Sequence, residues 1–175
     1  FLDSLEGQQQ QNNKSRPDVK CYTALMYAWA NSGSGDAVTK CTEILDKLWK
    51  LYSEDSSYRP TSATYRAIIE ACANSNDPNA AEIAEGWLTS MEESSAQGIV
   101  EQPNKAVYSS LMSLYLRQHD DNSGQQEQKV QTMYQRMLNS YEAGNIAAKP
   151  DAYAQTILLR AWAKSDDEDK ATKCW

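Results

Sequence analysis

A repeated, proline-led segment constrains the fold of this chain more than any other feature of its sequence. Similar segments follow Pro17, Pro60, Pro103 and Pro150, at spacings of 43, 43 and 47 residues. In the first three, a tyrosine stands five residues after the proline, and the fourth shares an Ala-Trp-Ala run with the first. Self-similarity at such a period predicts stacked structural units, because one unit alone cannot bury its apolar face. We expect one segment of a longer protein, with units at approximately 1–16 (partial), 17–59, 60–102, 103–149 and 150–175 (partial).

Each unit predicts two helices. In the first unit, apolar residues recur at helical spacing over residues 19–31, the NSGSGD segment then ends the helix, and Asp36 is a suitable N-cap for the second helix. Strand-forming residues are sparse, with a single phenylalanine, whereas Ala, Leu, Glu, Gln and Lys are abundant. We therefore expect an all-α protein, an α-solenoid of stacked helix-turn-helix repeats. The recurring Tyr22, Tyr65 and Tyr108 are expected to pack between helices.

Composition and single residues exclude several functions. The net charge of −7 argues against binding to duplex DNA or to anionic lipid, and the lack of an 18-residue apolar run predicts no membrane span. His119 is the only histidine, so a Ser/His/Asp or Cys/His arrangement is not expected. The four cysteines form no CxxC pair, which predicts buried reduced thiols and no metal site. We expect no enzyme and no cofactor in this segment; a catalytic domain outside it stays an open alternative.

Several motifs recur together in register. Each proline except Pro60 is followed by Asp or Asn, a tyrosine comes shortly afterwards, and a small-residue run such as Ala28-Trp29-Ala30 ends the first helix. This set resembles the pentatricopeptide repeat family, in a long-unit variant of 43–47 residues, over almost the whole chain. The resemblance implies a single-stranded RNA-binding protein of a mitochondrion or plastid, acting in RNA processing, stability or translation. It also implies that the first helices line a concave groove in which each repeat reads one base.

The resemblance further implies which side chains meet the RNA. The base is read by the residue just after the tyrosine, together with the residue just after the next proline. The base-reading candidates are Thr23 with Thr61, Arg66 with Asn104, Ser109 with Asp151, and Thr156. The pair Ser109 and Asp151 fits a combination that the family commonly uses, which implies guanine. The base-sandwiching candidates are Lys20, Ala63, Ala106 and Tyr153, and the phosphate-contact candidates are Arg117, Arg160 and Lys164.

The charge pattern leaves a second interpretation open. The acids concentrate in residues 60–102, where we expect a solvated outer face made by Glu82, Glu85, Glu92, Glu93 and Glu101. The first helices are not expected to be basic, so base stacking would supply much of the affinity for RNA. The low basicity and the enlarged tails equally suit a protein-binding scaffold subunit of a large organellar complex. A nuclease or editing enzyme with its catalytic domain elsewhere is the third alternative.

Overall fold

The computed structural model describes residues 16–75, 77, 79–117 and 123–164, and the chain is all-α over those residues. They form seven α-helices, two short 3-10 helices and no strand, which confirms the all-α prediction for this part of the chain. The helix bounds are Val19–Ala30 (α2), Ala37–Glu54 (α3), Ser62–Asn74 (α4), Ala80–Ala96 (α5), Lys105–Arg117 (α6), Ser123–Glu142 (α7) and Ala152–Lys164 (α8), with 3-10 helices at Ser56–Tyr58 (η1) and Ile146–Ala148 (η2).

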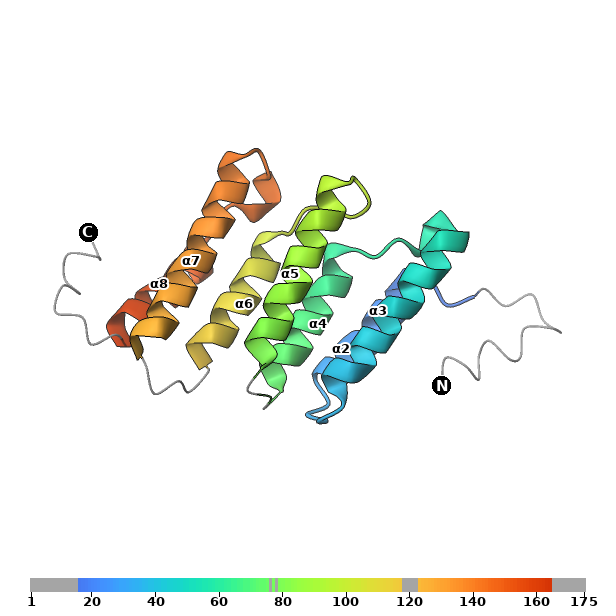
Figure 1. Ribbon diagram of the computed structural model, residues 1–175, viewed down its shortest axis with the longest axis horizontal. Helices are drawn as coiled ribbons and strands as arrows, with labels where there is room; N and C mark the ends of the chain where they lie inside the picture. The colour runs from blue at the N-terminus through green and yellow to red at the C-terminus, as the bar shows by residue number, and fades with distance from the viewer. Residues whose placement is uncertain (1–15, 76, 78, 118–122, 165–175) are drawn as a thin grey trace.

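The helices form two layers in chain order (Figure 1). In one layer α4 packs against both α2 and α6, and α6 packs against α8. In the other layer α3, α5 and α7 each pack against the helix that precedes them and the helix that follows them. We call α2, α4, α6 and α8 the first helices, and α3, α5 and α7 the outer helices. Each proline-to-proline interval therefore holds one first helix and one outer helix.

The recurring tyrosines are the anchors of the core. The side chains of Tyr22, Tyr65 and Tyr108 are 1%, 0% and 1% exposed, so the expected packing is confirmed. The Tyr65 ring packs edge-on against Trp87 of α5, with 6.5 Å between the ring centroids. The Tyr108 hydroxyl donates a hydrogen bond to Glu92, also on α5, at 3.0 Å. Each tyrosine thus fixes a first helix against an outer helix, which explains why this position repeats.

The residue after the proline starts each first helix. The Asp18 carboxylate accepts a hydrogen bond from the Cys21 backbone N–H at 2.9 Å, and its pKa is lowered by that bond. Asn104 and Asp151 cap α6 and α8 in the same way. Asp36 does occupy the N-cap position of α3, but its side chain makes no capping hydrogen bond. The cap prediction for α3 is therefore right in position and wrong in mechanism.

The polar tails between units contain structure that the sequence did not reveal. Helix η1 places the Tyr58 ring edge-on against Tyr22 at 6.4 Å, inside a small apolar cluster. After α7, the side chain of Asn145 is 5% exposed and donates to the Pro103 carbonyl at 2.8 Å, beside the preceding tail. The enlarged tails are thus packed parts of the fold, tied back to the start of their own unit.

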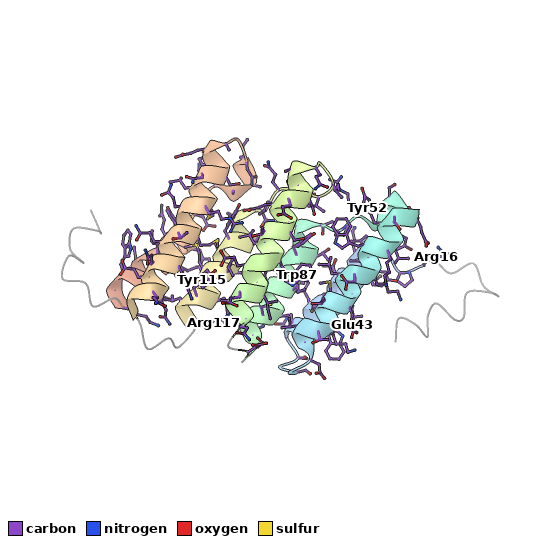
Figure 2. All side chains as sticks on the ribbon, in the orientation of Figure 1. Arg16, Glu43, Tyr52, Trp87, Tyr115 and Arg117 are labelled. Atoms are coloured by element: carbon purple, nitrogen blue, oxygen red, sulfur yellow. The ribbon has the colours of Figure 1, made fainter. Side chains whose placement is uncertain are left out.

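An arginine clasp between outer helices corrects the expectation of a wholly solvated acidic face. Arg136 of α7 binds the carboxylate of Glu92, and its Nη1 lies 3.7 Å from Glu85 Oε1. The hydroxyl of Tyr115 also donates to Glu85 at 2.6 Å, and Figure 2 shows this tyrosine between α5 and α7. Glu82 and Glu93 are exposed, as expected. Half of the acidic residues of α5 therefore join helices instead of only meeting solvent.

Some predictions lie outside the described residues. These are the contents of the first partial unit up to residue 15, the single histidine His119, and Cys174 in the last partial unit. Of the remaining cysteines, Cys41 and Cys72 are buried free thiols as expected, whereas Cys21 is exposed, which corrects that prediction for one residue. Cys21 lies in the first turn of α2, on the side away from the core.

Candidate nucleic-acid interface

On α2 and α8, the first helices at the two ends of the layer, side chains spaced three or four residues apart form a stripe that lines a pocket. In α2 its members Lys20, Thr23, Ala24 and Tyr27 all line a surface pocket of about 670 Å³. In α8 the corresponding members Tyr153, Thr156, Ile157 and Arg160 all line a second pocket, of about 480 Å³. Because equivalent positions line both pockets, and the first helices lie side by side, the stripes form one continuous face. We call it the first-helix face.

The α2–α4 pocket brings one predicted base-reading pair together. Thr23 and Thr61 both line it, as do the sandwiching candidates Lys20 and Ala63. The two threonines are joined through the buried Thr64, whose hydroxyl lies 3.2 Å from Thr23 Oγ1 and 3.3 Å from Thr61 Oγ1. The role of Thr64 could not be predicted from the repeat, because the equivalent positions in the other units are Cys21, Val107 and Ala154, which carry no hydroxyl.

Arg66 points along the face toward α2. Its guanidinium lies 5.3 Å from the Tyr27 ring centroid, and its Nε lies 3.8 Å from Glu70 Oε2, the ion pair expected from their spacing. Burial raises the pKa of Tyr27, and Arg66 opposes that rise. The predicted partner Asn104 caps α6 through Oδ1 and donates through Nδ2 to Ser62 at 3.3 Å. In the structure Arg66 therefore interacts with Tyr27 and Glu70, whereas Asn104 interacts with the start of α6 and with Ser62.

Ser109 and Asp151, the predicted pair that fits a combination common in the resembled family, are buried or paired within the protein. Ser109 is only 4% exposed. Asp151 caps α8 through Oδ1, and its Oδ2 lies 3.0 Å from Lys105 Nζ; the backbone hydrogen bond from Ala154 and this lysine lower its pKa. Neither residue lines one of the two pockets, and the half-buried Ala106 does not line them either.

The α4–α6–α8 pocket brings together the aromatic and basic candidates. Tyr153 is 59% exposed, and its hydroxyl lies 3.3 Å from Ser113 Oγ of α6. Arg117 at the end of α6 and Arg160 of α8 line the same pocket. Thr156 lines it too, while its hydroxyl donates to the Ala152 carbonyl. Two of the three phosphate-contact candidates therefore share a pocket with the exposed tyrosine.

The third phosphate-contact candidate is Lys164. Its Nζ donates to the Leu116 carbonyl at 3.3 Å, so it joins the ends of α8 and α6. The residue is exposed and lies on the same helix as Arg160, one turn further on. It thus extends the basic end of the face without lining the pocket.

The two helix layers differ in charge. Within their bounds, the first helices hold six basic residues and one acid, Glu70. The outer helices hold five basic residues and nine acids. The expectation that the first helices are not basic is therefore wrong for α2, α6 and α8, and it holds for α4, where Arg66 and Glu70 balance. Counting charge by repeat hid the difference between the layers, because each full repeat combines a first helix with an outer helix that is neutral or acidic.

Comparison with protein-family models, curated proteins and solved structures finds no match to this chain. Among the described residues, no helix is both long and apolar enough to cross a membrane. In the same part of the chain, no three His, Cys, Asp or Glu side chains gather where they could hold a metal ion. Function is therefore inferred from the geometry and charge of the first-helix face.

Proposed function

We propose that the first-helix face binds single-stranded RNA, and that the chain is an α-solenoid of pentatricopeptide type. The separation of charge between the layers carries this proposal: six basic residues and one acid lie on the first helices of a chain whose net charge is −7. Phosphate neutralisation is the main source of affinity for a nucleic-acid backbone, and it requires such a concentration of cations on one face. The acidic outer helices would repel the phosphates of a second nucleic-acid strand, so they favour a single strand on the opposite layer.

Stacking surfaces on the same face support a single strand. The exposed ring of Tyr153 and the half-buried ring of Tyr27 lie on α8 and α2, each within a pocket. Base stacking on such rings contributes roughly 1–3 kcal/mol for each base and needs an unpaired strand. The pockets, at about 670 and 480 Å³, are in the size range of small-ligand sites. Cations and rings therefore occur together on one face.

The biological setting follows from the repeat pattern. The likeness of the proline–tyrosine units to pentatricopeptide repeats supports a role in RNA processing, stability or translation inside a mitochondrion or plastid.

A protein-binding scaffold is the second candidate, favoured by one observation. Ser109 is buried and Asp151 is paired with Lys105, so this pair offers no open base-reading group. A partner polypeptide could lie along the face without needing these groups. In that case the basic face would select an acidic peptide.

Charge reversal on each layer tests the RNA proposal. Each phosphate contact contributes about 0.7 log units of affinity to a single strand at ~0.1 M salt, so losing two contacts costs about 25-fold, and reversal adds repulsion. We expect Arg117→Glu with Arg160→Glu to weaken binding of a fluorescent single-stranded RNA, measured by anisotropy, by at least that factor. Lys40→Glu with Lys50→Glu on α3 makes the same change of charge and should cost less than threefold. Equal losses in the two variants would reject the first-helix face as the site.

A further inference from the structure

The α2–α4 pocket has mostly apolar walls, so its few polar groups decide which ligand it can select. The Tyr27 ring and the methyl groups of Ala24 and Ala63 line it, and so do the side chains of Thr23 and Thr61. Thr61 is half-buried, whereas Thr23 is only 8% exposed. Thr61 is therefore the threonine that is more open to a ligand.

The hydroxyl groups of three threonines form a chain of hydrogen bonds with one direction. Thr23 Oγ1 donates its only proton to the Val19 carbonyl at 2.8 Å. The bond between Thr23 and Thr64, at 3.2 Å, is therefore donated by Thr64, whose side chain is fully buried. Thr64 then has no second proton, so the bond at 3.3 Å is donated by Thr61. This is the one assignment that makes every bond in the chain.

The direction of the chain turns the Thr61 hydroxyl into an acceptor for the pocket. The Thr64 oxygen also accepts the Thr61 backbone N–H at 3.2 Å, so its proton and both its lone pairs are in use. The Thr61 proton is held by Thr64, and in the capping box of α4 the Thr61 oxygen also faces the Thr64 backbone N–H. One lone pair of Thr61 is then left for a ligand. A ligand that meets Thr61 must therefore bring a hydrogen-bond donor.

From this chain we infer that the α2–α4 pocket selects a base with an exocyclic amino group against uracil, and that Thr64 is the positioning residue that sets the preference. Adenine, guanine and cytosine carry an amino donor on the base edge, whereas uracil carries carbonyl oxygens there. A carbonyl placed against the lone pair of Thr61 makes no hydrogen bond and leaves an acceptor unsatisfied. The Tyr27 ring and the exposed Lys20 of the same pocket are suited to the base and to a phosphate. The inference rests on the proposed function, because it concerns one base of a bound strand.

The test compares oligocytidylate with oligouridylate of the same length, with binding measured by fluorescence anisotropy. The two bases have the same ring size, and cytosine has an amino group where uracil has a carbonyl. We expect this pocket to favour the cytidine strand about fivefold, the value of one net hydrogen bond. Other repeats contact the same strands, so the quantity compared is the ratio of the two affinities in the parent chain and in each variant.

Thr64→Val keeps the shape of the side chain and removes the hydroxyl. The Thr61 proton is then released and can donate to a uracil carbonyl, so we expect the affinity ratio to fall about fivefold. Thr64→Ser keeps the hydroxyl and should retain the ratio. Thr42→Val is the matched control, because it removes a hydroxyl that donates to the Val38 carbonyl on the outer helix α3, and it should leave the ratio unchanged.

A second variant covers the case in which Thr64→Val unfolds, which circular dichroism melting would show. Thr61→Val removes the acceptor itself, and it should lower the ratio by the same factor of about five. Since this substitution leaves the buried bond between Thr64 and Thr23 in place, it tests the same contact from the ligand side.

The outcomes separate this inference from the proposed function. An affinity ratio that Thr64→Val and Thr61→Val leave unchanged, even where both strands bind more weakly, would overturn the inference and leave RNA binding intact. A ratio that falls as far in Thr64→Ser as in Thr64→Val would overturn it too, because packing and not the hydroxyl would then be responsible. If neither strand binds the parent chain, the RNA proposal fails and the inference falls with it.

Discussion

Removal of the Arg136 guanidinium tests whether the clasp holds the outer helices together. Arg136→Met keeps the apolar stem of the side chain and removes its hydrogen bonds to Glu92 and Thr89. Glu92 then keeps only the Tyr108 hydroxyl as a donor, at 3.0 Å. The carboxylate is left partly buried and short of partners, so we expect the variant to be less stable.

The size of the loss follows from burial. The side chains of Arg136 and Glu92 are each 29% exposed, so the pair lies between an exposed ion pair and a buried one. Exposed pairs contribute about 0–1 kcal/mol, whereas breaking a buried pair costs about 3–5 kcal/mol. We therefore expect a loss of about 2 kcal/mol. For a chain of this size the loss lowers Tm by about 6 °C. Glu85 adds little, because it is 48% exposed and 3.7 Å away.

Urea unfolding followed by circular dichroism measures this loss. A double-mutant cycle with Glu92→Gln isolates the pair, and we expect a coupling energy of about 1 kcal/mol or more. Lys50→Met, at an exposed position of α3, is the matched control and should stay within about 0.5 kcal/mol of the parent. A loss below about 0.5 kcal/mol for Arg136→Met, or a coupling energy near zero, would refute the stabilising role of the clasp.

Three further predictions concern the core and the tails. Burial raises the pKa of Cys41 to about 11 and of Cys72 to about 12, so a thiol reagent at neutral pH should modify Cys21 in the folded chain and these two only after unfolding; peptide mass spectrometry checks this, and equal rates would contradict it. Burial also raises the pKa of Tyr108 to about 12, so the folded chain favours the neutral forms of this tyrosine and of the two buried thiols. Urea midpoints should therefore be constant up to about pH 8.5 and fall as the pH rises from there toward 12. A midpoint that rises with pH would contradict this direction. Asn145→Ala removes hydrogen bonds to Pro103 and Ser140 and should lower the free energy of unfolding by about 1–2 kcal/mol in the same assay; an unchanged midpoint would mean that these bonds do not hold the tail in place.

The helices could be predicted because their signals are local and repeated. The first helix expected over residues 19–31 is observed as Val19–Ala30, and Asn31 follows as its C-cap. The tyrosine five residues after the proline in the first three units predicted the core face, because its spacing from the proline sets its position on the helix. The tails could not be predicted in this way, because η1 and η2 are held by tertiary contacts with the helices of their own units, η1 with α3 and η2 with α6 and α7.

The sequence predicted which side of the first helices forms the candidate site, but not the contacts between the side chains. The stripe through Lys20 and Thr23 follows from helix periodicity, and the structure places both in one pocket. The joining residues were missed because they act over long separations: Thr64 meets Thr23 across 41 positions, and Arg136 meets Glu92 across 44. Glu70 was assigned only to its neighbour Arg66, since nothing in the sequence showed that it also lines a pocket with two arginines from other helices.

Photo-crosslinking tests the central claim, that RNA lies along the first-helix face, most directly. A single-stranded RNA carrying 4-thiouridine is irradiated with the chain, and the attached peptides are mapped by mass spectrometry. We predict that crosslinks fall on the first helices, at Tyr27 of α2 and Tyr153 of α8 above all, since these rings line the two pockets. Crosslinks confined to α3, α5 and α7, or none in a mixture at saturating RNA, would contradict the account.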